Sequence, residues 1–287
     1  MKKLNLLVAF FTLLAFVVSC GDDDGNEPVV PVDDELDVEI PTTGFVSPES
    51  YPNLTLTWEE QFTGDALNRN NWTFETGTGV NGWGNNELQY YREENTSLVD
   101  GHLVITAKEE SFSGSNYTSS RLVTMNKRNF RYGRIDVRAA LPKGQGIWPA
   151  IWMLGTNFPS VGWPASGEID IMEMVGGNGR ENTVHGTVHW QNQGQHAEFG
   201  GSKTRSSGTY SDEFHVYSII WTENRIRWLI NDEEYHAIDT SPAELDEFRS
   251  PFFFIVNLAV GGNWPGSPNN STSFPQHLIL DYIRVFQ

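Results

Sequence analysis

Apolar and polar residues alternate with a period of two along most of the chain after about residue 51. Alternate side chains of a β-strand point to opposite faces, so this period predicts strands bounded by Gly, Asn, Asp and Pro. Only residues 241–248 could form a turn or two of helix. Many strands with few helices predict an all-β sandwich of two antiparallel sheets. The predicted strands are residues 102–108, 134–141, 182–190, 215–222, 225–231, 252–260 and 278–286.

One segment, GEIDIMEM (167–174), breaks the alternation. Glu168 and Asp170 share a parity, whereas Glu173 has the opposite one, and the apolar positions shift at the same point. One extra residue near Met172, a β-bulge, would turn the three acids to one face and the apolar residues to the other. Bulges re-aim side chains and are common beside active sites. The residues predicted to face inwards are Ile169, Ile171 and Met174.

Three carboxyl groups on one strand face suit the hydrolysis of a glycosidic bond. Retaining glycoside hydrolases use two carboxyl groups about 5–5.5 Å apart, one as the nucleophile and the other as the acid and base. The nucleophile must be ionised and the acid protonated, so their surroundings must push the two pKa values apart. A third carboxylate between them can tune that difference. The alternative is a solvated strand face whose acids have no catalytic role.

The first fifty residues are predicted to lie outside the fold. Two lysines precede a short apolar run, which is the layout of an export signal over residues 1–19. Cys20 is the only cysteine, so no internal disulfide can form. Its context, FVVSCGDDD, resembles a bacterial lipobox and predicts lipidation, although a simple signal peptide with an incidental cysteine is the alternative. Residues 20–50 are acidic and contain proline, which predicts a flexible linker.

These features predict a protein that is lipid-anchored to the bacterial outer membrane and exposed at the cell surface, with no other membrane contact. Residues 51–287 have the length of one large β domain, and we expect a monomer. The chain has a net charge of -18, which disfavours nucleic acid and sulfated polymers as partners. It also has 10 Trp, 9 Tyr and 17 Phe, so a neutral ligand that stacks on aromatic rings fits better.

GEIDIMEM resembles the catalytic signature of glycoside hydrolase family 16. Other segments are similar to the laminarinase branch of that family: GWGNNELQYY, SSRLVTMNK, YGRIDVRAALPKGQGIWPAIWMLG, HGTVHW, GGNWPG and LDYIRVFQ. The resemblance implies a jelly roll with a concave cleft in residues 51–287. It implies retaining endo-hydrolysis of β-1,3-glucosidic bonds in laminarin-like β-glucans through a covalent glycosyl-enzyme intermediate, without a catalytic cofactor. Glu168 would be the nucleophile, Asp170 the assisting carboxylate and Glu173 the general acid and base.

Aromatic and polar residues around this signature are candidates for sugar binding. Trp148 and Trp152 share a strand face, and tryptophan rings pack against pyranose faces, although a core position is the alternative for both. His189 lies on a strand expected to pair with the catalytic one. Four further residues are candidates by family position: Trp163, Trp264, Asn85 and Arg121. The alternative for Asn85 is a structural asparagine in a turn, and the alternative for Arg121 is an arginine that pairs with a nearby acid.

Metal sites are predicted only on the side away from the cleft. His185 and His189 have no third ligand at a suitable spacing, so we expect no zinc site. Relatives hold a structural calcium ion, and the resemblance implies Asp281 as its side-chain ligand with the backbone of Gly101. A buried, hydrogen-bonded aspartate is the alternative. Glu60 stands where the family usually has Asp, which argues against occupancy.

Other activities remain open within the same chemistry. A mixed-linkage β-1,3-1,4-glucanase and an agarase-type galactan hydrolase share the signature, and a transglycosylase would pass the same intermediate to a sugar. A surface glycan-binding protein without catalysis is the alternative of a different class. Such proteins lose one or both glutamates, whereas both stand here.

Overall fold

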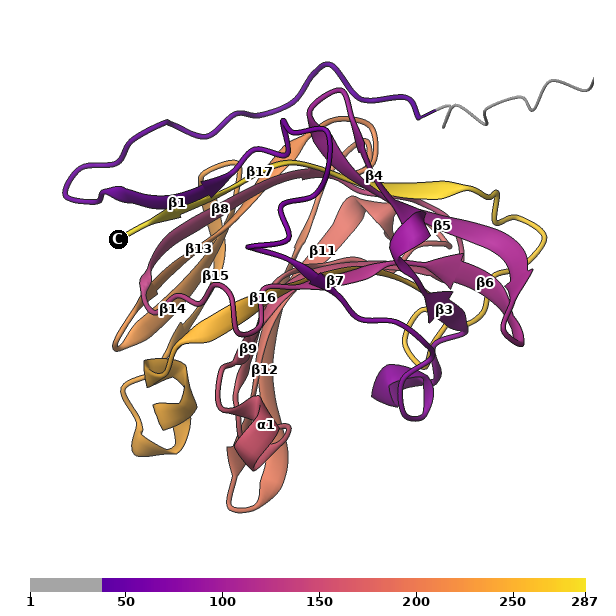
Figure 1. Ribbon diagram of the computed structural model, residues 1–287. Coiled ribbons are helices and arrows are strands. Elements are labelled where there is room, and N and C mark those ends of the chain that lie inside the picture. The colour runs from indigo at the N-terminus through magenta and orange to yellow at the C-terminus, as the bar shows by residue number, and fades with distance from the viewer. Residues whose placement is uncertain (1–37) are drawn as a thin grey trace, which may run out of the picture. The chain divides into compact units, whose positions relative to one another are not determined.

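Two sheets make up most of the protein, for which a computed structural model describes residues 38–287 (Figure 1). The predicted signal peptide, Cys20 and the first part of the predicted linker lie outside the described residues. The larger sheet contains β1 (Leu56–Glu60), β3 (Gln89–Tyr91), β4 (Thr96–Val99), β5 (His102–Phe112), β6 (Ser115–Ser119), β8 (Gly133–Ala140), β13 (His215–Thr222), β14 (Arg225–Ile230), β15 (Glu233–Asp239) and β17 (Gln276–Phe286).

The smaller sheet carries the candidate catalytic strand at its middle. Its strand order is β12-β11-β10-β9-β16-β7-β2, and all of its pairings are antiparallel. Its strands are β2 (Thr73–Phe74), β7 (Arg121–Val123), β9 (Ile147–Gly155), β10 (Glu168–Glu173), β11 (Thr183–Asn192), β12 (Gln195–Thr204) and β16 (Phe252–Val260). The short helical segments are η1 (Gly82–Asn86), η2 (Glu93–Asn95), α1 (Phe158–Val161), η3 (Arg180–Asn182) and η4 (Ala243–Arg249). No helix within residues 38–287 is long and apolar enough to span a bilayer.

The main core lies between the two sheets and follows from the period-two pattern. Ile135 and Val137 of β8 are fully buried, and they join the same apolar cluster as Ile151 and Met153 of β9. Burying one such side chain stabilises the fold by roughly 1.5–3 kcal/mol. The all-β sandwich predicted from the sequence is confirmed. The seven predicted strands are also confirmed, and residues 215–222 and 225–231 form a hairpin in which Thr222 is opposite Arg225.

The predicted flexible linker is wrong for residues 38–50, which pack on the larger sheet. The backbone of Phe45 donates to the Phe214 carbonyl at 3.0 Å, and Arg138 donates to the Phe45 carbonyl at 2.7 Å. Val38 and Ile40 pack against a small apolar cluster of that sheet. The short apolar pattern of this segment therefore finds a surface to cover, which an acidic composition alone did not predict.

Candidate active site

The predicted β-bulge is present in β10. Asp170 is opposite Thr187 of β11, yet Glu173 is opposite His185, so three steps along β10 match two along β11. The register with β9 shifts between Asp170 and Met172. As predicted, the bulge brings the three acids to the outer face of the smaller sheet, where they line one cleft. The side chains that enter the main core are Ile169, Ile171, Met172 and Met174.

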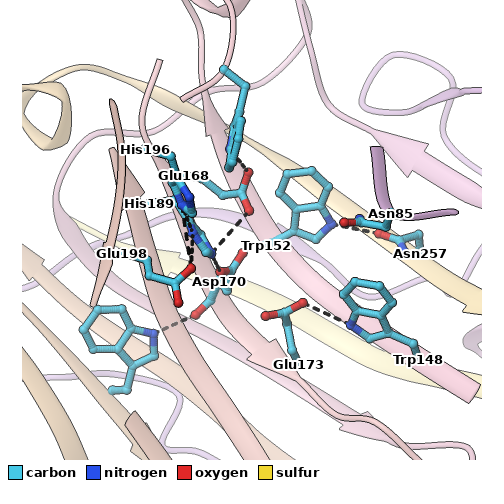
Figure 2. Close-up of polar contacts among 12 residues, drawn as sticks. Asn85, Trp148, Trp152, Glu168, Asp170, Glu173, His189, His196, Glu198 and Asn257 are labelled. Carbon is cyan, nitrogen blue, oxygen red and sulfur yellow. Dashed lines mark hydrogen bonds and ion pairs between the residues drawn. The ribbon is translucent and has the colours of Figure 1, made fainter. Parts of the chain in front are cut away.

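Each acid has a different set of hydrogen-bond partners (Figure 2). The Trp163 indole donates to Glu168 Oε2 at 2.9 Å, and the Trp148 indole donates to Glu173 Oε1 at 3.0 Å. Asp170 Oδ2 lies 3.1 Å from His189 Nε2. Figure 2 shows Glu168 and Asp170 beside His189, and Glu173 beside Trp148. The two glutamates thus face the same cleft from separate environments.

The bulged strand is also tied to the opposite sheet. The indole of Trp228, on β14, donates to the backbone carbonyl of Asp170 at 2.8 Å across the sandwich. The ring of Trp228 is fully buried. A buried carbonyl needs a partner, and an indole can supply one only where the tryptophan is within reach. Trp228 therefore holds the backbone at the point where the acids are aimed.

Burial raises the pKa of all three acids, and neighbouring charges raise those of Glu168 and Glu173 further. Burial, and then the charge of Asp170, raise the pKa of Glu168 from 4.5 to about 8. Burial raises the pKa of Asp170. Burial, followed by the charges of Asp170 and Glu168, raises the pKa of Glu173 well above its usual value. Three ionised carboxylates in so small a space would repel one another, so we expect the three acids together to hold at least one proton near neutral pH.

The cleft is large enough for several sugar units, with a volume of about 1130 Å³. Trp264 packs edge-on against Trp148 with ring centroids 5.6 Å apart, and the ring centroids of His185 and Trp264 are 4.9 Å apart. Trp163 and Trp264 are 48% and 40% exposed, which is unusual for rings of that size and suits stacking on a ligand. Every residue predicted to bind substrate lines this cleft: Asn85, Arg121, Trp148, Trp152, Trp163, His189 and Trp264.

The wall near β7 holds a dense polar network. Arg121 donates to Glu75 at 2.6 Å, and its guanidinium lies over the rings of Trp83 and Trp152. The Trp152 indole donates to Asn257 at 2.7 Å. Asn85 also lines the cleft, and its side-chain amide donates a hydrogen bond to Glu87 Oε1 at 3.2 Å. Arg121 therefore forms an ion pair with an acid, which was its alternative structural role, and it also lines the cleft.

Four other tryptophans are buried or partly buried around the core. Trp72, Trp221 and Trp228 are fully buried, and Trp58 packs against the core from its edge. Trp148 and Trp152 are only partly buried and belong to the cleft.

Asp281 does not fit a calcium site as it is arranged. Its Oδ2 accepts from the Arg138 guanidinium at 2.6 Å, and its Oδ1 lies 3.6 Å from His102 Nε2. The guanidinium therefore occupies space that a calcium ion needs for oxygen ligands. Glu60 is engaged elsewhere, because its carboxylate accepts from Asn71 and Trp72. These contacts favour the alternative interpretation of a hydrogen-bonded aspartate, and they supply no oxygen shell for the backbone of Gly101 to complete.

The sequence did not predict two ionisable residues that lie beside His189 in the cleft. His196 and Glu198, on edge strand β12, lie beside His189. The hairpin of β11 and β12 places Glu198 directly opposite His189. His196 and Glu198 are therefore two further candidate ligands beside His189, whereas His185 is not part of this group. Gly194, which closely follows the strand predicted over residues 182–190, was the signal that could have located the turn of this hairpin.

Comparisons with known proteins agree with this geometry. The family model of glycosyl hydrolases family 16 matches residues 83–283. The chain is 42% identical over 253 residues to the β-glucanase of Rhodothermus marinus, covering 82% of this chain and 86% of that protein. The clotting factor G alpha subunit of Tachypleus tridentatus is 41% identical over 239 residues, which are 82% of this chain but only 34% of that subunit.

Solved structures show the same architecture. The laminarinase catalytic domain from Thermotoga maritima MSB8 is 43% identical, with a TM-score of 0.75. The match covers 82% of this chain and 98% of that one.

Proposed function

This chain belongs to glycoside hydrolase family 16, and we propose that it hydrolyses internal β-1,3-glucosidic bonds of laminarin-like β-glucans with retention at the anomeric carbon. The observation that carries this proposal is the bulged strand β10, which presents Glu168, Asp170 and Glu173 to one aromatic cleft. The relatives named β-glucanase and laminarinase support the same substrate class.

In the first step, the Glu168 carboxylate attacks the anomeric carbon while the Glu173 carboxyl gives its proton to the glycosidic oxygen. The leaving sugar departs with that proton, and the glycosyl group stays bonded to Glu168. The Trp163 N–H stabilises the ionised form of Glu168 before the attack, since it donates to Oε2. Glu173 also accepts one indole N–H, from Trp148, but burial and the charges of Asp170 and Glu168 raise its pKa well above its usual value, which favours its protonated form.

In the second step, the Glu173 carboxylate takes a proton from water, and that water attacks the anomeric carbon and releases Glu168. Asp170 lies between the two glutamates on the strand and contacts His189. We assign it the assisting role, because its charge changes the proton affinity of both neighbours. All atoms that act on the bond belong to side chains and water, so this scheme needs no cofactor.

The cleft favours a neutral polymer. Its exposed rings suit pyranose faces, and its acids and the net charge of -18 repel sulfated chains. Mixed-linkage glucan and agarose remain the competing substrates of the same chemistry. A glycan-binding protein without catalysis is disfavoured, because both glutamates, Glu168 and Glu173, are present.

The test is to incubate the purified protein with laminarin, lichenan and agarose. We propose that the protein acts as a monomer. Product sizes and the first-formed anomer are then read by chromatography and proton NMR. We expect short β-1,3-linked oligosaccharides from laminarin, with the β anomer formed first. Release of α anomer first, or turnover of agarose alone, would refute the proposal. Glu168→Gln is the matched control that should bind glucan without cleaving it.

We also propose that the protein is held at the outer membrane surface through a lipid on Cys20, which lies outside the described residues. The support is the lipobox-like sequence FVVSCGDDD. Cys20→Ala is expected to move the protein from the membrane fraction to the soluble fraction in cell fractionation. Continued retention in the membrane fraction would contradict the anchor.

A further inference from the structure

Three ligand-type atoms converge at the end of the cleft where Trp163 lies. His189 Nδ1 lies 2.9 Å from His196 Nε2, and Glu198 Oε2 lies 3.5 Å from the first and 3.7 Å from the second. Figure 2 shows the three side chains pointing toward one another from β11 and β12. None of the three belongs to the bond-breaking steps described above.

These separations fit a tetrahedral metal ion. Donors bound to zinc at about 2.0–2.1 Å in a tetrahedron are roughly 3.3 Å apart, and the three observed distances lie on either side of that value. A point about 2.0 Å from all three atoms exists, which is the bonding distance for nitrogen and oxygen on zinc. Two imidazoles and one carboxylate suit zinc, cobalt, nickel or copper, whereas calcium and magnesium prefer oxygen alone.

A simple hydrogen bond does not account for the whole cluster. The 2.9 Å contact between the imidazoles could be an N–H···N bond. However, the contacts of Glu198 at 3.5 and 3.7 Å are longer than the roughly 2.7–3.2 Å of a hydrogen bond. An ion pair with a protonated imidazole would account for the two Glu198 contacts alone. Ligation of one metal ion accounts for all three distances, because ligands of one ion approach one another without bonding.

The surroundings of His189 match those of a metal-binding histidine. Its other ring nitrogen, Nε2, faces Asp170 Oδ2 at 3.1 Å. Ligating histidines usually donate that second N–H to a carboxylate or carbonyl, which fixes the tautomer and aims the lone pair at the metal. A proton on Nε2 leaves the Nδ1 lone pair pointing at the cluster.

The hairpin holds the three ligands in place and leaves them accessible. Glu198 is directly opposite His189, and His196 is opposite Gln191, two residues further along β11. Trp163 packs against the His196 ring with centroids 4.7 Å apart. The side chains of His196 and Glu198 are 37% and 62% exposed, so an ion can enter from solvent and keep a water as its fourth ligand.

We propose that His189, His196 and Glu198 bind one divalent ion of the zinc class at the mouth of the cleft. The site adjoins the predicted nucleophile, since His189 Nε2 also lies 3.8 Å from Glu168 Oε1. Binding of the ion is separate from the proposed hydrolase activity, because it can be measured without substrate.

The test uses the untagged full chain, freed of metal with a chelator and titrated with Co²⁺. A tetrahedral Co²⁺ site gives visible absorption bands, and we expect them to saturate at one ion per chain and to disappear when Zn²⁺ is added. His196→Ala and Glu198→Gln are expected to weaken Co²⁺ binding by at least about tenfold. Loss of a residue that only supports a ligand already lowers metal affinity by about 10–100-fold, so loss of a ligand should cost at least as much. His185→Gln, which removes another cleft imidazole, is the control and should keep the bands.

Thermal unfolding guards against a variant that fails to fold. Zn²⁺ is expected to raise the Tm of the wild type and of His185→Gln, but to leave the Tm of Glu198→Gln nearly unchanged. Glu198 is well exposed, so its substitution by the isosteric amide should preserve the fold. Absence of the bands in the wild type, or equal Co²⁺ affinity in the wild type and both ligand variants, would overturn the proposal.

Discussion

Substituting Glu168 by Gln is expected to stabilise the fold at alkaline pH while it abolishes hydrolysis. The Glu168 side chain is only 17% exposed, and burial with the neighbouring Asp170 raises its pKa from 4.5 to about 8. A carboxyl group whose pKa rises on folding costs the folded state free energy when it ionises. That cost is absent at low pH, grows as the pH rises from the unfolded value, and is complete above the folded value.

The magnitude follows from the size of the shift. At about 1.36 kcal/mol per pKa unit, a shift from 4.5 to about 8 corresponds to roughly 5 kcal/mol at full ionisation. This value is a ceiling, because the carboxylate is partly exposed in an open cleft and water screens part of its charge. The amide keeps an oxygen that can accept from the Trp163 indole, so the packing is preserved.

The assay is urea unfolding of the wild type and Glu168→Gln at several values between pH 5 and pH 9. We expect the free energy of unfolding of the variant to exceed that of the wild type by an amount that increases with pH and levels off above about pH 8. Glu244→Gln, at an exposed carboxylate, is the control and should show no such trend. A difference that is constant with pH, or that shrinks as pH rises, would refute the reasoning.

Three further changes test the roles of cleft and core residues. Glu173→Ala is expected to slow laminarin hydrolysis by about 10²–10⁴-fold and to spare aryl glucosides whose leaving group needs no proton; equal losses in kcat on both substrates would argue against Glu173 as the acid. Trp148→Phe removes the 3.0 Å bond that favours the ionised form of Glu173, so the basic limb of the kcat/KM profile should move to higher pH, and an unmoved limb would contradict the assignment. Ile169→Ala empties a fully buried position beneath the acids and should lower the free energy of unfolding in urea by about 2–5 kcal/mol; a loss below about 1 kcal/mol would show that the residue does not fill the core.

The N-terminal boundary shows where composition misleads. An acidic, proline-containing segment predicts a flexible linker as far as residue 50, yet residues 38–50 contact the larger sheet through Phe214 and Arg138. Gly44 pairs with Phe214 so closely that a side chain there would meet the Phe214 carbonyl at 2.1 Å. Composition averages over a segment, whereas docking depends on a few apolar and small residues meeting one particular surface.

The sequence by itself determined the two-sheet sandwich and the bulge in GEIDIMEM. Both follow from the alternation of apolar and polar residues, over many segments for the sandwich and within one segment for the bulge. The phase of Ile169 and Met174 was enough to turn Glu168 and Glu173 to the same side. Trp148 and Trp152 were predicted for the cleft from their spacing, and Trp163 and Trp264 from the family resemblance.

Only the tertiary structure decided which residues meet across strands. Edge strand β12 lacks an apolar face, so no hydrophobic period revealed that His196 and Glu198 lie beside His189. The pairing of Asp281 with Arg138, and of the Trp228 indole with the Asp170 carbonyl, likewise joins residues that are distant in the sequence. Register between strands depends on the sum of many contacts in the folded sandwich, and a single strand does not carry that information.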